Sequence, residues 1–148
     1  MQKLPPIEKI AESYTAIIDN RIELHEGYAV CKSSDSSKSY DIIWKDKTYY
    51  SNDNSTYWQG YIGYPVIAVL MLKGKLPLNK EILKYFKGIN WKQLNKKHKN
   101  KYSEALNEVL NNISAENKKL INKEMNYVYE QIKKLDIELT RKKIVDEN

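Results

Sequence analysis

Residue types that carry nucleophilic or acid–base chemistry are scarce in this sequence. Cys31, His25 and His98 are its one thiol and two imidazoles. Cys31, His25 and Asp41 could be drawn as a nucleophile, a base and an orienting acid. No G-x-S-x-G elbow or other motif of acyl transfer accompanies them, and a lone cysteine in a strand is usually a small core residue. The sequence therefore favours a protein that is not an enzyme.

Metal and cofactor sites are not expected either. His25, His98 and Cys31 lack the paired spacing of zinc ligands. The loop Asn52-Asp53-Asn54 offers oxygen ligands, but it lacks the glycine and the distal glutamate of a calcium loop. An ordinary Asx-rich turn is the expectation there. No glycine-rich phosphate loop is present among the five glycines, so no cofactor is expected.

The stretch from residue 57 to residue 64 has the most unusual local composition, with four aromatic rings around two glycines. The candidate pocket residues are Tyr57, Trp58, Tyr61 and Tyr64. Such rings can stack on a base or a sugar. Gly60-Tyr61-Ile62-Gly63 also matches the G-x-x-G loop of KH domains, although that loop usually holds polar or basic residues between its glycines. The alternative is that the rings seal the approach to a buried helix.

Residues 73–101 carry the strongest indication of function, because they hold ten lysines against the single acid Glu81. Their net charge of +9 exceeds the +6 of the whole chain. Lys80–Lys87, the turn Gly88-Ile89-Asn90 and Trp91–Lys99 have the outline of a helix-turn-helix. The candidate nucleic-acid-binding residues are Lys84, Lys87, Lys92, Gln93, Lys96, Lys97, Lys99 and Lys101.

The chemistry of this basic segment indicates charge neutralisation rather than base reading. Lysine acts as a point charge on phosphates, and the segment has no arginine for bidentate contacts to guanine. Trp91 and Tyr102 could add stacking. An acidic protein surface is a second class of partner, and a merely solvated lysine-rich face is the alternative to both.

Helices and strands must hold these candidate residues in place. We expect the apolar run Pro65–Leu72 to form the centre of the hydrophobic core around which those elements pack. It has no polar side chain, begins with proline and is followed by Lys73-Gly74, as in a short helix. A bilayer span needs about 20 residues, so this run does not predict a membrane protein. We expect a short buried helix.

The N-terminal half is expected to contain one helix and a small sheet. Within segment 1–19, apolar residues recur at helical spacing from residue 6 and predict an amphipathic helix. Segment 20–56 predicts an antiparallel meander. Its candidate strands are Ile22–Leu24, Tyr28–Lys32, Tyr40–Trp44 and Thr48–Tyr50.

The C-terminal half is expected to be helical. Segment 57–113 would hold the aromatic loop, the buried helix and the basic helices, with residues 91–112 forming one helix or two. Segment 114–143 predicts a long helix of roughly 43 Å. A 4-3 apolar spacing marks one side of it, at Ile121, Met125, Val128, Ile132, Leu135 and Leu139. This seam would either cover the domain's own core or pair two chains as a homodimer.

The sequence as a whole predicts a single α+β domain over residues 1–148. The expected function is a non-catalytic module that binds a polyanion, nucleic acid first, through residues 73–101. The alternatives are a small-ligand pocket or undetected enzyme around residues 57–64, and an assembly subunit that dimerises through its C-terminal helix. A single cysteine and the absence of an apolar N-terminal segment predict a cytoplasmic location.

Overall fold

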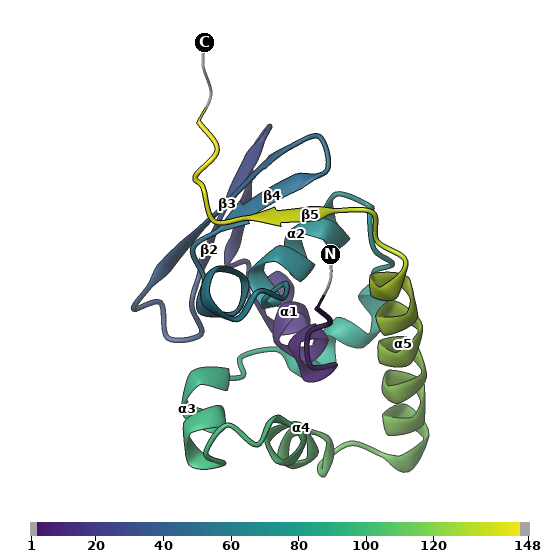
Figure 1. Cartoon of the computed structure of the whole chain (residues 1–148). Coiled ribbons are helices and arrows are strands. Elements are labelled where there is room, and N and C mark those ends of the chain that lie inside the picture. Colours follow the sequence, from purple (N-terminus) through teal and green to yellow (C-terminus); the bar gives the residue numbers. More distant parts are fainter. Residues whose placement is uncertain (1–2, 146–148) are drawn as a thin grey trace.

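The computed structural model describes residues 3–145 and confirms the α+β class, with helices packed beneath one face of a five-stranded sheet (Figure 1). The strands are β1 (Ile22–Leu24), β2 (Tyr28–Lys32), β3 (Ser39–Lys45), β4 (Thr48–Ser51) and β5 (Glu138–Thr140). The α-helices are α1 (Glu8–Ile18), α2 (Tyr64–Leu72), α3 (Trp91–Lys97), α4 (Tyr102–Leu110) and α5 (Ala115–Lys133). A π-helical turn, η1 (Ser55–Gln59), and a 3-10 helix, η2 (Lys80–Phe86), complete the chain.

The sheet contains the predicted antiparallel meander, in the order β1-β2-β3-β4. The inward-facing side chains of these strands, including Ala29, Cys31, Ile42 and Tyr49, are buried. In the β3–β4 hairpin the left-handed backbone position is taken by Asp46, with φ 54°, which explains how the turn forms without glycine.

Helix α2 is the buried helix that the apolar run predicts. Every residue from Pro65 to Met71 is buried, and Val66 to Leu70 are fully so. Gly74 follows the helix with φ 77°, the left-handed conformation that ends helices. Burial of each large side chain contributes about 1.5–3 kcal/mol, so α2 is a main source of stability.

Helix α1 has the predicted amphipathic sequence, yet it is as central as α2 and is buried on its polar side as well. It packs against α2, η2, α4 and α5, and its residues 9–16 are all buried. Among the described residues, the buried Tyr14 hydroxyl has no hydrogen-bond partner, whereas Lys9, Glu12, Ser13 and Thr15 find partners inside the protein. Lys9 Nζ lies 3.1 Å from Glu12 Oε2, and Ser13 Oγ donates to the carbonyl oxygens of Lys9 and Tyr64, both at 2.9 Å. Hydrogen bonds and an ion pair therefore allow these polar side chains to be buried at helix positions where the apolar spacing of the sequence predicts solvent exposure.

The long C-terminal helix is shorter than predicted. Helix α5 ends at Lys133, and the chain then forms β5, which lies parallel to β4 at the edge of the sheet. The amide nitrogen of Glu138 donates to the carbonyl oxygen of Lys47 at 2.8 Å, and Leu139 pairs with Tyr49. The open edge of β4 competes with continued helix, and strand pairing satisfies the backbone groups of both segments.

The apolar seam covers the core of its own chain, the first of its two interpretations. Its members on α5 are Ile121, Met125, Val128 and Ile132, none more than 2% exposed. Leu135 and Leu139 follow the helix and pack partly buried against the same core. The four seam side chains on α5 are therefore buried within the chain itself.

The segment 91–112 forms two helices rather than one. Lys99 and Asn100 adopt left-handed backbone conformations, with φ 54° and 63°, and break the helix between α3 and α4. Among the helices of residues 3–145, none has both the length and the apolar character that crossing a membrane requires.

Candidate functional site

The helices α3 and α4 lie at the end of the molecule away from the sheet (Figure 1), and α3 together with the turn before α4 carries five of the seven candidate lysines. Helix α3 is anchored by Trp91, which is 2% exposed. Its indole Nε1 donates to Thr15 Oγ1 at 2.8 Å, and Thr15 in turn donates to the carbonyl oxygen of Phe86 at 2.6 Å. Trp91 therefore holds α3 against α1 and is not exposed for stacking.

The helix-turn-helix outline is not realised. Its first element, η2, is a 3-10 helix packed on α1, and α3 has seven residues, about 10 Å in length. The Gly88 amide between them donates to both carboxylate oxygens of Asp19, at 2.9 and 3.1 Å. The turn is therefore held against the end of α1, and α3 is too short to serve as a recognition helix.

Six of the predicted lysines lie between the end of η2 and the start of α4, on α3 and in the segments that flank it. We call Lys87, Lys92, Lys96, Lys97, Lys99 and Lys101 the lysine corner; all six are exposed. Within residues 3–145, the side chains of Lys87, Lys96, Lys99 and Lys101 have no hydrogen bond or ion pair, whereas those of Lys92 and Lys97 pair with carboxylates. The seventh, Lys84, lies apart in a groove of about 560 Å³ between η2 and α5.

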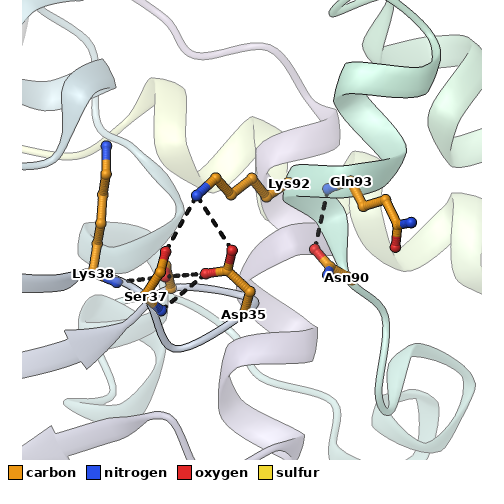
Figure 2. Close-up of polar contacts among 7 residues, drawn as sticks. Asp35, Ser37, Lys38, Asn90, Lys92 and Gln93 are labelled. Carbon is orange, nitrogen blue, oxygen red and sulfur yellow. Dashed lines mark hydrogen bonds and ion pairs between the residues drawn. The ribbon is translucent and has the colours of Figure 1, made fainter.

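Lys92 clamps α3 to the loop between β2 and β3 (Figure 2). Its Nζ lies 3.2 Å from Asp35 Oδ2 and 3.2 Å from Ser37 Oγ. Asp35 also accepts hydrogen bonds from the Ser37 amide at 2.9 Å and from Ser33 Oγ at 3.0 Å. Hydrogen bonds from Ser37, with smaller contributions from Ser33 and Lys92, hold the pKa of Asp35 well below its usual range. The ammonium of Lys92 is thus engaged by a carboxylate that stays ionised.

A second set of charges joins α3 to α4. Lys97 Nζ lies 2.5 Å from Glu108 Oε1, and His98 Nε2 lies 3.3 Å from the same oxygen. His98 Nδ1 is 3.7 Å from Glu104 Oε2. The hydrogen bond from Lys97 lowers the pKa of Glu108. The charge of Glu108 is therefore balanced by the basic groups of α3.

A hollow of about 660 Å³ lies between α3 and α4, beside the lysine corner. It is lined by Gly88, Ile89, Asn90, Gln93, Leu94, Lys97, Glu108, Val109 and Asn112. Gln93 was among the predicted binding residues, whereas Val109 and Asn112 were not. No local signal marks those two, because they join the site only through the packing of α4 against α3.

The candidate rings of the aromatic stretch differ in exposure and in their neighbours. Tyr57 and Trp58 meet edge to face with ring centroids 4.8 Å apart, and Trp58 is 67% exposed. Tyr61 lies beneath Lys3, whose Nζ is 5.4 Å from the ring centroid. The hydroxyl of Tyr64 is in the interior, where burial raises its pKa well above the usual range. The four rings thus lie in three different surroundings.

The loop before α2 is built for packing rather than for ligand binding. Asp53 is buried and accepts hydrogen bonds from Ser51 Oγ and from the Thr56 amide, the latter at 3.1 Å, and burial raises its pKa. The Gly63 amide donates to Thr56 Oγ1 at 3.0 Å, and Ile62 is fully buried. Residues 52–54 therefore form the Asx-rich turn expected, and the G-x-x-G segment is not an exposed clamp.

Cys31, His25 and Asp41 do not form the arrangement of nucleophile, base and acid considered above. Cys31 is buried, and burial raises the pKa of its thiol to about 12. His25 Nε2 instead lies 2.8 Å from Glu23 Oε1, and Asp41 follows the Tyr40 that pairs with Cys31, so it faces the opposite side of the sheet. Cys31 is the small core residue that was expected. Within the described chain, no three His, Cys, Asp or Glu side chains are grouped to hold a metal ion.

Comparison with protein families gives one match, over residues 2–138, to a family described as Uncharacterised conserved protein UCP014422. No curated protein and no solved structure matches the chain. The matched residues include the whole lysine corner and the hollow beside it.

Proposed function

We propose that this chain, which belongs to the family described as Uncharacterised conserved protein UCP014422, is a non-catalytic module that binds nucleic acid through the lysine corner. The observation that carries the proposal is a run of exposed lysines without anionic partners. Lys87, Lys96, Lys99 and Lys101 are exposed and unpaired within residues 3–145. Because they lie on α3 and on the segments that flank it, at the end of the molecule that holds α3 and α4, we expect their charges to add there.

The proposed affinity comes from release of counterions from phosphates. Four unpaired lysines that each neutralise one phosphate would give a slope of log affinity against log salt of about −3 to −4 on duplex DNA. Lys92 and Lys97 already face Asp35 and Glu108, so they add less to this slope. Lysine does not supply the bidentate contacts that arginine makes to guanine, and therefore these side chains bind without reading sequence.

The test is a titration of labelled DNA duplexes of several sequences by fluorescence anisotropy, from about 50 to 200 mM salt. The corner variant changes Lys87, Lys96, Lys99 and Lys101 to Gln. The control variant changes four exposed lysines outside the corner to Gln: Lys32, Lys45, Lys134 and Lys143. Both variants lose the same charge. We expect the corner variant to lose binding to all duplexes alike and the control to retain most of the parent's slope.

Three results would contradict this function. The first is no binding of the parent at about 50 mM salt. The second is equal weakening in both variants, which would mean that net charge alone is responsible. The third is binding of polyglutamate but not of nucleic acid, which would point to an acidic protein surface as the partner.

The other predicted functions have less support. No function is proposed for residues 57–64, because their rings are dispersed, or for pairing through α5, because its seam is buried. We place the proposed module in the cytoplasm, where nucleic acid is accessible and a free thiol such as Cys31 stays reduced.

A further inference from the structure

We infer that the hollow between α3 and α4 receives an unstacked base, so that the protein prefers single-stranded nucleic acid over duplex. The inference rests on the proposed function, because the lysine corner would hold the phosphates on either side of that base. The hollow, about 660 Å³, is within the size range of small-ligand sites.

The floor of the hollow suits the flat face of a base. Ile89, Leu94 and Val109 line it and are partly buried against the core. Apolar side chains that remain partly exposed in a concave surface gain free energy when a flat apolar group covers them. A base has such a face, whatever its identity.

The rim of the hollow suits the edge of a base. Within residues 3–145, the side-chain amides of Gln93 and Asn112 have no hydrogen-bond partner. The side-chain oxygen of Asn90 accepts from the Gln93 backbone amide at 3.1 Å, which leaves its NH2 group free (Figure 2). Each amide offers a donor and an acceptor side by side, the arrangement that pairs with the edge of a base.

Charge around the hollow favours a nucleotide over a neutral ligand. Its one acidic lining residue, Glu108, pairs with Lys97, and the ring of His98 lies 3.3 Å from the same carboxylate oxygen. Lys87 and Lys96 of the lysine corner adjoin the lining residues Gly88 and Lys97 in the chain. A phosphate backbone can therefore follow the basic rim while a base turns inward.

Strand preference follows from how bases are presented. In a duplex each base is stacked and paired, and bringing one into a pocket requires that both interactions break. In a single strand the bases can splay out and reach a recessed site. Contacts to phosphates do not require that a base leave its stack. A preference for single strand over duplex therefore indicates that a base enters the hollow.

The experiment compares three labelled probes of equal length: a single strand, its duplex, and a strand of abasic sites. We expect the parent to bind the single strand about tenfold more tightly than the other two. Gln93→Ala with Asn112→Ala should remove that preference while leaving duplex affinity and salt slope unchanged, because no charge is altered. The matched control is Asn107→Ala with Asn111→Ala, two exposed α4-region amides outside the hollow.

The outcomes separate the two claims. Equal binding of the single strand and the abasic strand, or an unchanged preference in the Gln93/Asn112 variant, overturns the inference and leaves the proposed function standing. If the parent protein binds none of the three probes, the proposed function itself is overturned. Circular dichroism of both amide variants confirms that they fold, which is expected because neither pair of side chains is buried.

Discussion

The contact between Gly63 and Asp53 allows a sharp test of how the chain enters α2. Gly63 has φ −79° and ψ 173°, a conformation open to any residue, so its backbone does not require glycine. A methyl group there would lie 3.0 Å from Asp53 Cγ and 3.1 Å from Ser55 Cβ, and closer still to Asp53 Oδ2. Gly63→Ala therefore tests side-chain space alone.

The size of the effect follows from what Asp53 would have to give up. Ordinary non-bonded contacts are about 3.5–4.0 Å, and the methyl group would lie far inside that distance from Asp53 Oδ2, so the carboxyl group must move by more than about 1 Å. Asp53 is 4% exposed, and the movement breaks its hydrogen bond to the Thr56 amide. Overpacking costs about 1–3 kcal/mol and a lost buried hydrogen bond about 1–3 kcal/mol, which together make about 2–6 kcal/mol. For a chain of this size we expect Tm to fall by roughly 5–25 °C.

Urea unfolding and thermal melts of four proteins test this reasoning: the parent, Gly63→Ala, Asp53→Ala and the double variant. In the Asp53→Ala background the methyl group at residue 63 meets no carboxyl group, and we expect it to cost less than about 1 kcal/mol. Gly74→Ala is the control for backbone strain, because Gly74 has φ 77° and open space around it. If Gly63→Ala costs the same in both backgrounds, the proposed clash is wrong.

Two further predictions concern Cys31 and the Lys92 clamp. Burial raises the pKa of the Cys31 thiol from 9.0 to about 12, so the thiol should resist a thiol reagent in the native protein at about pH 8 and react on unfolding. Between pH 9.0 and about 12 the thiol ionises in the unfolded chain but not in the folded one. The parent should therefore lose stability relative to Cys31→Ala as the pH rises through this range. Rapid native labelling would contradict this. Asp35→Asn should release Lys92 and steepen the salt slope of DNA binding by about 1, whereas the equally charged change Asp46→Asn in the β3–β4 turn should leave it unchanged. An unaltered slope in Asp35→Asn would mean that Lys92 does not reach phosphate.

The sequence predicts the elements of this fold best where one requirement dominates. The run Pro65–Leu72 has no polar side chain, so α2 had to be buried. The burial of the polar side of α1 is not predicted, because Lys9, Glu12 and Ser13 have the residue types expected of a solvent-exposed helix face. Their partners include the carbonyl oxygen of Tyr64, which lies 51 residues from Ser13 along the chain. No periodicity carries that information.

The end of α5 was misplaced for a related reason. Leu135 and Leu139 continue the 4-3 spacing of the helix, yet they pack against the core from a turn and from β5. An apolar residue at such a position fits a helix or a strand equally well. The deciding factor is the open edge of β4, which exists only once the sheet has formed.

The sequence predicts the positive charge of the candidate site, but it does not predict the hollow or the contacts that shape the site. The lysines could be counted in the sequence, and their exposure follows from their chemistry. The clamp between Lys92 and Asp35 spans 57 residues, and the hollow needs α4 to fold back on α3. Both depend on tertiary packing, which sequence spacing does not encode.

The parallel pairing of β4 with β5 has a consequence for how the protein is made. Synthesis runs from the N-terminus, and about 90 residues separate β4 from β5, roughly 5–18 s of translation. During that interval the edge of β4, with Tyr49 and Tyr50, has no strand beside it. An open edge of this kind can pair with another nascent chain. We therefore expect aggregation during expression to depend on how quickly residues 134–140 reach the sheet.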